Sequence, residues 1–225
     1  QYGFTEAFRY ATIYNPTAPV MDKSLPEYGN YFQQTLFDYY NPASIVEQNV
    51  NNGNVNDING SVKGQYEFAD LIPGLSISAF YSEQNSKSSG GHFYPSTGFW
   101  RGYSRNGLAD RYEDNSINRL IQTTAHYNNT VMDKLNLEAL AGYSWQKFVF
   151  DGFNMNGGEF ITDHFGYNNM GGAQDFQEGI GNVGSYKNRH KLIAYFGRLN
   201  LSYDNTYLLS GSVRHEGSSR FGANN

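Results

Sequence analysis

Cysteine is absent from this chain of 225 residues. Its absence excludes a scaffold held by disulfides and a metal site built on thiolates. Long apolar runs are absent as well: the longest clean run covers residues 192–196, far short of the ~20 residues that a helix needs to cross a membrane. A signal peptide is not recognisable either, because residues 1–3 offer neither a basic start nor an apolar core.

An excess of positive charge is also missing. Lys and Arg total 16 against 21 for Asp and Glu, the formal net charge is −5, and the signs are well mixed. Nucleic-acid binding requires a basic patch or stripe, so the charge pattern argues against it. Aromatic side chains are abundant, with 19 Tyr and 16 Phe, although the mean hydropathy is only −0.62. Strand-forming and turn-forming residues dominate, which predicts an all-β protein.

Alternation with a period of two marks the predicted strands, since successive side chains of a strand point to opposite faces. In residues 58–68 one face carries apolar residues and glycine, and the other carries Asn, Ser, Lys, Gln and Glu. The same pattern predicts further strands at residues 75–84, 116–128, 135–148, 190–203 and 207–216. In the fourth and fifth strands, Leu137 and Ile193 fall on the apolar face, and Glu138 and Ser202 fall on the polar face.

The connections between the predicted strands alternate in length. Short turns at Pro73-Gly74 and at residues 204–206 join strands within pairs, and long loops at about residues 85–115 and 149–189 join one pair to the next. Long loops argue against a compact soluble domain, whereas short periplasmic turns and long extracellular loops are typical of an outer-membrane barrel. Alternation alone does not distinguish a barrel from a β-sandwich. Strands of ~10 or more residues with aromatic rings near their ends favour a tilted membrane crossing.

Two motifs near the C-terminus carry a resemblance to a known family. Residues 195–203, Tyr-Phe-Gly-Arg-Leu-Asn-Leu-Ser-Tyr, resemble the SYFGR-N-Y-Y strand of the SusC/RagA-type TonB-dependent outer-membrane transporters. Residues 217–222, Gly-Ser-Ser-Arg-Phe-Gly, resemble that family's R-DGSSRFG segment, in matching order and spacing. Weaker similarities to its NPT-PV and NP stretches occur at residues 15–20 and 40–43. Residues 215–216, His-Glu, depart from the usual Arg-Asp.

The resemblance implies an antiparallel transmembrane β-barrel with short periplasmic turns and long extracellular loops. Residues 1–225 would supply about six strands of one 22-stranded receptor barrel domain, with the plug domain and the remaining strands outside this chain. It also implies import of glycans or peptides across the outer membrane of a Gram-negative, Bacteroidota-like bacterium. TonB would energise import through the plug, a SusD-like lipoprotein would cover the extracellular side, and membrane lipid would surround the barrel. Neither enzymatic chemistry nor a cofactor is expected.

Aromatic residues in the two long loops are the candidate substrate contacts. They are Phe93, Tyr94, Phe99, Trp100 and Tyr103 in the first loop, and Phe160, Phe165 and Tyr167 in the second. Flat rings beside Asn, Asp and Arg suit sugars or peptides, which bind by stacking and by polar contacts. The alternative is that these rings pack the large loops against one another. The glycine pairs 90–91, 157–158 and 171–172 are expected to be flexible spacers in the same loops.

Other chemistry has weak support in the sequence. The five histidines are not at ligand spacing. Asp110, Glu113 and Asp114 could offer oxygen ligands to calcium, but they lack the spacing of an EF-hand, so a solvated loop is the other interpretation. Asp163-His164 is not accompanied by the Gly-x-Ser-x-Gly elbow of a hydrolase. Two rival functions stay open: a passive porin-type barrel, and a soluble all-β lectin or adhesin that presents the aromatic loops to sugars.

Overall fold

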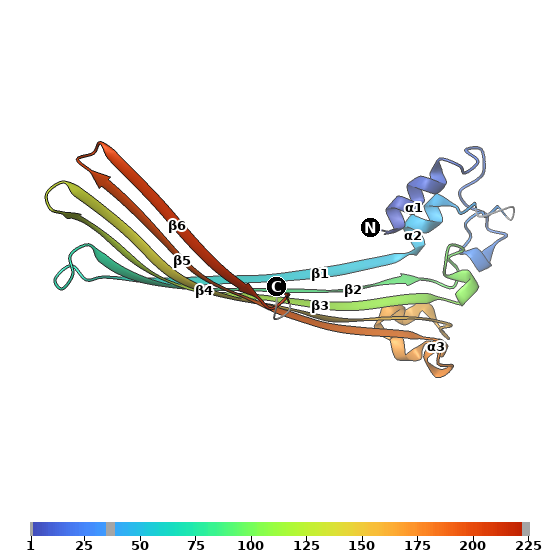
Figure 1. The fold of residues 1–225 in the computed structure, drawn as a ribbon. Coiled ribbons are helices and arrows are strands. Elements are labelled where there is room, and N and C mark those ends of the chain that lie inside the picture. The colour runs from blue at the N-terminus through green and yellow to red at the C-terminus, as the bar shows by residue number, and fades with distance from the viewer. Residues whose placement is uncertain (1, 35–38, 222–225) are drawn as a thin grey trace. The chain divides into compact units, whose positions relative to one another are not determined.

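A six-stranded sheet dominates the computed structural model, which describes residues 2–34 and 39–221 of the chain (Figure 1). Its strand order is β1-β2-β3-β4-β5-β6, so each strand lies beside its neighbour in sequence. The strands are β1 (Val50–Glu67), β2 (Leu75–Tyr94), β3 (Leu108–Val131), β4 (Leu135–Gly158), β5 (Asn182–Tyr203) and β6 (Tyr207–Ser218). This meander confirms the predicted all-β, antiparallel fold class. Gly222, the last residue of the second sequence motif, lies outside the described residues.

Short helices precede β1 and occupy the connections. They are α1 (Tyr2–Ala11), α2 (Pro42–Gln48) and α3 (Gln174–Gln177), with 3-10 turns at Pro26–Tyr28, Tyr103–Arg105, Asp163–Asn168 and Met170–Gly172. Helix α2 begins where the side chain of Asn41 accepts hydrogen bonds from the N–H groups of Ala43 and Ser44. None of these helices was predicted from the sequence, because helices this short depend on tertiary packing more than on a periodic pattern.

No helix among residues 2–34 and 39–221 is long and apolar enough to cross a membrane.

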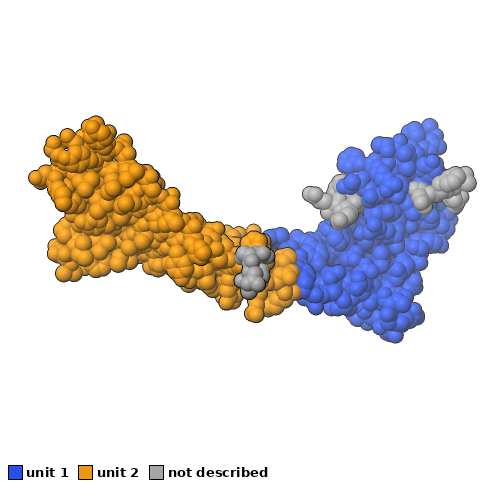
Figure 2. Space-filling model, in the orientation of Figure 1, with its two compact units in different colours: residues 1–55, 88–114, 152–186 blue, residues 56–87, 115–151, 187–225 orange. Residues whose placement is uncertain are grey.

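The chain divides into two compact units (Figure 2). Unit 1 comprises residues 1–55, 88–114 and 152–186, and unit 2 comprises residues 56–87, 115–151 and 187–225. The helices and the connections β2–β3 and β4–β5 belong to unit 1, whereas the tight turns β1–β2, β3–β4 and β5–β6 belong to unit 2. Short turns and long loops are therefore segregated, as the alternation in connection length predicted.

Left-handed backbone conformations build the tight turns of unit 2. Asp204 and Asn205, with φ of 48° and 53°, follow β5 directly, and residues of these two types adopt positive φ more readily than other non-glycine residues. Met132 and Asp133 also adopt positive φ, of 55° and 57°, in the turn between β3 and β4. These turns return the chain at once, so the strands on either side must be antiparallel.

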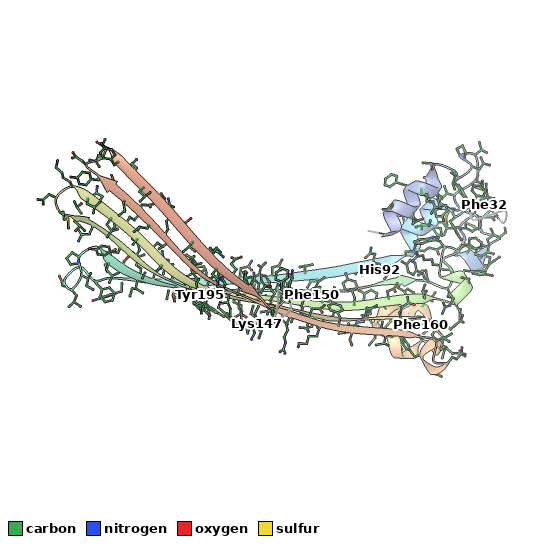
Figure 3. The ribbon with its side chains drawn as sticks, viewed as in Figure 1. Phe32, His92, Lys147, Phe150, Phe160 and Tyr195 are labelled. Carbon is green, nitrogen blue, oxygen red and sulfur yellow. The ribbon has the colours of Figure 1, made fainter. Side chains whose placement is uncertain are left out.

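The pairing of β5 with β6 fixes which side chains share a face. The register places Leu201 opposite Leu209 and Asn200 opposite Ser210. Directly opposed residues point to the same face of a sheet. One face of this hairpin is therefore apolar and the other is polar, as the alternation predicted, and side chains project from both faces of the strands (Figure 3).

The apolar face of unit 2 has a defined width. On β5 it extends from Tyr203 to Ile193 and is followed, on the same face, by Lys191. Tyr203 and Ile193 are ten positions apart, which spans ~34 Å of strand at ~3.4 Å per residue and ~24 Å across a membrane at a tilt of ~45°. That width is close to the ~25 Å apolar band of an outer-membrane barrel.

The strands extend farther into the predicted loops than expected. The first loop covers residues 95–107 rather than 85–115, and the second covers residues 159–181 rather than 149–189. The predicted loop bounds were wrong because the intervening segments are rich in Asn, Gly and Ser, residues of low strand propensity. Hydrogen bonding to neighbouring strands overrides that propensity.

Two of the three glycine pairs do not lie in the loops, so the expectation that they act there as flexible spacers was wrong for those two. Residues 90–91 lie within β2, residues 157–158 end β4, and residues 171–172 belong to a 3-10 turn. A Cβ on Gly91 would lie only 2.5 Å from Cγ of Tyr167. Glycine is required there because the ring of Tyr167 packs directly on the backbone of β2.

Candidate functional site

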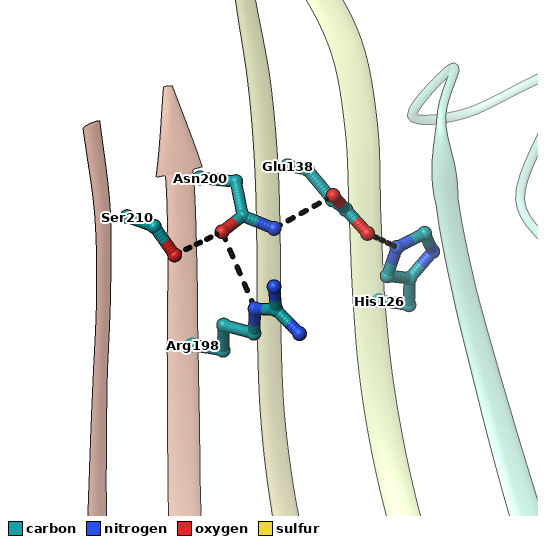
Figure 4. A network of polar contacts seen from close by, with 5 residues as sticks. All are labelled: His126, Glu138, Arg198, Asn200 and Ser210. Carbon is teal, nitrogen blue, oxygen red and sulfur yellow. Dashed lines mark hydrogen bonds and ion pairs between the residues drawn. The ribbon is translucent and has the colours of Figure 1, made fainter. Parts of the chain in front are cut away.

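A ladder of polar side chains crosses four neighbouring strands of unit 2 (Figure 4). His126 of β3 contacts Glu138 of β4, with 3.2 Å between Nε2 and Oε1. Asn200 of β5 donates from Nδ2 to Oε2 of the same carboxylate at 2.8 Å. Ser210 of β6 and Nε of Arg198 both donate to Oδ1 of Asn200, at 2.7 and 3.3 Å. These five residues, here named the polar ladder, align because the strand register brings one polar face into line.

The polar ladder is exposed rather than buried. The side chains of His126 and Glu138 are 38% and 48% exposed, and a shallow hollow of about 550 Å³ lies over Glu138, Arg198, Asn200 and Ser210. Exposed ion pairs of this kind contribute only ~0–1 kcal/mol to stability. Their hydrogen bonds can instead be exchanged with water or with a polar ligand, which suits a wet surface lined with carboxylate, guanidinium and amide groups.

The polar face continues beyond the ladder. Ser78 of β2 and Thr124 of β3 share a hydrogen bond of 2.7 Å between their hydroxyl oxygens. Gln146 of β4 donates from Nε2 to Oδ1 of Asn118 on β3 at 3.0 Å. Hydrogen-bonding groups therefore line this face on every strand from β2 to β6.

The opposite face of unit 2 carries rings and aliphatic side chains, with charge at its edge. Tyr143 and Tyr195 contact each other across β4 and β5, with ring centroids 5.2 Å apart. Where the apolar stretch of β2 ends, the hydroxyl of Tyr81 donates to Glu83 at 2.5 Å. Arg119 donates hydrogen bonds from Nε and Nη2 to the two oxygens of the same carboxylate, at 3.0 and 3.1 Å. A tyrosine beside a charged pair is typical of a membrane–water boundary.

Two of the predicted loop aromatics, Tyr94 and Trp100, belong to a core of unit 1. Their side chains are 5% and 6% exposed and pack with Tyr10 and Ile45. The two rings meet edge to face at 5.4 Å, and the guanidinium of Arg101 lies 4.8 Å from the centroid of the Trp100 ring. The chain's own residues thus cover these rings and anchor the first loop to the N-terminal helices.

A second core joins the two loops. Phe93 and Phe160 are 4% and 5% exposed, with ring centroids 5.9 Å apart, and the half-buried Tyr167 packs against them. Ser96 donates from its backbone N–H and from its hydroxyl to Oδ2 of Asp163, at 2.9 and 2.8 Å. Packing of the loops against one another, the alternative interpretation of the aromatic residues, therefore describes this group.

Four predicted contact residues keep exposed surface: Tyr103, Phe165, Phe99 and Tyr167. Tyr103 is 43% exposed, Phe165 is 52% exposed and Phe99 is half-buried. Phe99 and Tyr103 share a cluster with Tyr28, whose ring lies 5.0 Å from Phe99 and 4.8 Å from Tyr103. Phe165 contacts the ring of His164, with ring centroids 5.2 Å apart. The rings of Tyr28, Phe99 and Tyr103 form the best surface for stacking among the candidates, and their contact with a substrate stays a prediction.

A buried carboxylate was not singled out from the sequence. Asp175 is 2% exposed, and its Oδ2 accepts a hydrogen bond from Arg105 and another, at 2.6 Å, from the backbone N–H of Gly158. Its Oδ1 has no partner among the described residues. Sequence offers no signal for this contact, because Asp175 and Arg105 are 70 positions apart.

The acidic residues considered for calcium lie on a strand, so their assignment to a loop was wrong. Asp110, Glu113 and Asp114 all belong to β3. Asp110 accepts from Nδ2 of Asn156 at 2.6 Å, and Asp114 accepts from the hydroxyl of Tyr186. Because side chains alternate along a strand, Glu113 points to the face opposite Asp110 and Asp114. The three carboxylates do not converge.

Comparison with known proteins gives consistent relatives. The chain is 28% identical over 225 residues to TonB-dependent receptor P3 of Formosa agariphila, which covers 98% of the chain and 20% of the relative. It is also 29% identical over 195 residues to TonB-dependent receptor SusC of Bacteroides thetaiotaomicron. That match covers 82% of this chain and 17% of the relative. No protein-family model matches.

Solved structures show the same fold. The RagAB peptide transporter matches with a TM-score of 0.74 at 18% identity, over 87% of this chain and 21% of that one. The RagAB peptide importer in its open-open state matches with a TM-score of 0.68 at 19% identity. The chain thus spans about a fifth of the length of these proteins. The relatives are receptors and transporters, which confirms the prediction that the chain is not an enzyme.

Proposed function

This chain is a segment of a SusC/RagA-type TonB-dependent transporter of the outer membrane, and from that premise we propose that the whole protein imports nutrients. Residues 1–225 form part of one barrel domain, and the plug domain and the remaining strands belong to the rest of the protein. The short turns that join the strands in pairs are proposed to face the periplasm, and the long loops to face the cell exterior, as in other outer-membrane barrels. The host is a Gram-negative, Bacteroidota-like bacterium.

The polar ladder carries this proposal. His126, Glu138, Asn200 and Ser210 face one side of the same strands whose other side is apolar. A water-soluble sandwich buries its apolar face against a second sheet, whereas a membrane barrel turns that face to lipid and its polar face to a wet lumen. An exposed hydrogen-bonding ladder is the lining that a polar substrate needs along its path.

The proposed substrates are oligosaccharides or peptides. RagAB is named as a peptide transporter, and the exposed ring of Tyr103 and the half-buried rings of Tyr28 and Phe99 offer stacking surface for sugar rings or peptide side chains. A SusD-like lipoprotein is the proposed partner on the loop side. TonB is the proposed source of energy and acts through the plug.

Uptake by whole cells tests the proposal. Cells that express the full-length protein are expected to accumulate a fluorescent oligosaccharide or peptide, and a protonophore or deletion of TonB is expected to stop accumulation. Replacing Glu138 by Gln should slow uptake by up to ~10-fold, because a hydrogen bond to a charged group contributes ~1.5 kcal/mol. Glu67→Gln is the matched control, since it removes a carboxylate from the same face of β1 outside the ladder. Accumulation that continues without TonB would favour the passive porin.

Labelling of single cysteines separates the barrel from the soluble lectin or adhesin. The chain has no cysteine of its own, so each introduced thiol is unique. In native membranes, Cys at Glu138 or Ser202 should react with a water-soluble thiol reagent, and a spin label at Leu137 or Ile193 should respond to a lipid-confined quencher. A lack of quenching at both Leu137 and Ile193 would mean that the apolar face is a protein core, and the transporter interpretation would fail.

A further inference from the structure

Positive side chains gather on the apolar side of unit 2, just beyond the end of the apolar band. We call one side of the strands the exterior face. It comprises the apolar face and, beyond the end of the apolar band, every second residue that points to the same side. Beyond Ile193, Trp145 and Ile121, that face carries a group here named the basic rim: Arg119 of β3, Lys147 of β4, and Lys187, Arg189 and Lys191 of β5. All five residues belong to unit 2.

Ring contacts fix the position of the basic rim on the exterior face. Tyr143 contacts Tyr195 on the exterior face, and Phe148 stacks on His190 at 4.4 Å on the polar face. In an antiparallel pair, moving one residue back along β4 corresponds to moving one residue forward along β5. Because Phe148 lies opposite His190, Lys147 lies opposite Lys191 (Lys147 is labelled in Figure 3). Two ammonium groups therefore face the same side at directly opposed positions.

Charge is distributed unevenly between the two faces of unit 2. The charged residues of the exterior face are Lys87, Arg119, Lys147, Lys187, Arg189 and Lys191, against Glu83 and Asp151. Those of the polar face are Lys63, Arg198 and Arg214, against Asp57, Glu67, Glu138 and Glu216. The exterior face is strongly positive although the whole chain has a net charge of −5.

Among the described residues, the opposed lysines form no ion pair with an acid. Arg119 is paired with Glu83, but within residues 2–34 and 39–221 no carboxylate forms an ion pair with Lys147, Lys187, Arg189 or Lys191. Like charges opposite one another destabilise a sheet. An anion from outside the chain would remove that repulsion.

We propose that the basic rim binds the phosphate groups of lipid headgroups in the leaflet remote from the short turns. The apolar band offers a surface for acyl chains, and the rim begins where headgroups replace them. Long Lys and Arg stems can lie along the apolar surface while their charged ends reach the phosphates. Basic residues at a membrane surface bind anionic lipid in this way. The proposal depends on the membrane-spanning fold, and it does not depend on which substrate is imported.

Lipid binding by the full-length protein tests the proposal. The protein is placed in nanodiscs of zwitterionic phosphatidylcholine, and diphosphoryl lipid A or its dephosphorylated form is added and counted by native mass spectrometry. Wild type should retain the phosphorylated lipid, and the double variant Lys147→Gln/Lys191→Gln should bind it about 30-fold more weakly, given ~1 kcal/mol per basic residue. The control Lys23→Gln/Lys63→Gln removes the same charge away from the exterior face and should bind as wild type does.

The outcomes separate the proposal from its rivals. Equal retention by the rim variant and wild type, or equal binding of the dephosphorylated lipid, would overturn it. A change of oligomeric state in the rim variant without any change in lipid binding would overturn it too, and would assign the rim to a second copy of the protein. If the double variant does not fold, Lys187→Gln/Arg189→Gln on β5 replaces it with the same expected loss. Substrate uptake should be unchanged in the rim variants, so a failed lipid test leaves the transport proposal intact.

Discussion

The two units of this chain are held together in different ways. In unit 1 the described structure buries Tyr10, Ile45, Phe93 and Trp100 among other side chains, each 7% exposed or less. In unit 2, among the described residues, Ala194 is the only buried side chain. Many large apolar side chains of unit 2 are exposed instead, for example that of Val213, which is 71% exposed.

The difference shows that the units are suited to different solvents. Unit 1 follows the rule of water-soluble proteins, in which apolar side chains are removed from water into a packed core. The described residues of unit 2 form no such core, so in the proposed barrel its strands would depend on the backbone ladder and on lipid against the apolar face. A protein that crosses a membrane and projects loops into water requires both arrangements.

Truncation of a core ring in unit 1 should have the largest effect. Replacing Trp100, which is 6% exposed, by Ala removes a ring from the core and should destabilise unit 1 by about 3–5 kcal/mol. Limited proteolysis of the full-length protein across a urea series measures the local opening of the loops. Phe165→Ala is the control, since this ring is 52% exposed and its loss should cost below ~1 kcal/mol. Equal protease sensitivity of the two variants would contradict a core at Trp100.

Charge on the apolar face of unit 2 should have the next largest effect. Leu199 lies between Ile193 and Tyr203 on β5, and its replacement by Arg should cost about 2–4 kcal/mol because the charge enters the apolar band. Ser202→Arg places the same charge on the polar face and should cost much less. Urea unfolding of the full-length protein in lipid vesicles, followed by circular dichroism, measures both. A larger cost for Ser202→Arg would reverse the assignment of the faces.

Loss of the buried carboxylate should have a moderate effect on unit 1. Asp175→Ala leaves the N–H of Gly158 and the guanidinium of Arg105 without their acceptor, which should cost about 1–3 kcal/mol. The same proteolysis assay applies, with cleavage expected in residues 159–181. Asp70→Ala, at an exposed turn of unit 2, is the control. The contact between the two loops would be unimportant if the Asp175 variant resisted protease as wild type does.

A titration should have the smallest effect and should again be confined to unit 1. Tyr31 donates to Oε2 of Glu47 at 2.5 Å, and this hydrogen bond, with burial and the negative charge nearby, raises the pKa of Tyr31 from 10.0 to about 12. The hydroxyl stabilises the fold while it is protonated, so its contribution is complete below pH ~10 and is lost as the pH rises through about 12. Tyr31→Phe should abolish that pH-dependent loss in thermal unfolding. A loss of stability that persists in the variant would assign it to another group.

Different parts of the fold were open to prediction to different degrees. The alternation at residues 58–68 and 190–203 identified strands and their faces, since a strand separates its two sets of side chains completely. The loop bounds were wrong because Asn-, Gly- and Ser-rich segments such as residues 85–94 join the sheet through backbone hydrogen bonds that carry no side-chain pattern. The helices before β1 were missed for a related reason, as tertiary packing stabilises them.

The candidate site, too, could be predicted from the sequence only in part. The sequence placed Glu138 on the polar face, but the strand register decided that His126, Asn200 and Ser210 would meet around it. The loop aromatics were recognisable as a group from the sequence. Their division into the buried rings of Tyr94 and Trp100 and the exposed ring of Tyr103 required the packing of the loops.

By itself, the sequence determined that the chain forms long antiparallel strands with one apolar and one polar face, and its motifs identified the family. These properties are local, because alternation and turn residues act over a few positions. The tertiary structure decided which polar residues form the ladder, which rings are buried, and that Lys147 and Lys191 stand opposed on the exterior face. Those outcomes depend on register between strands that are distant in sequence, and register is fixed only when the backbone hydrogen bonds of the whole sheet form together.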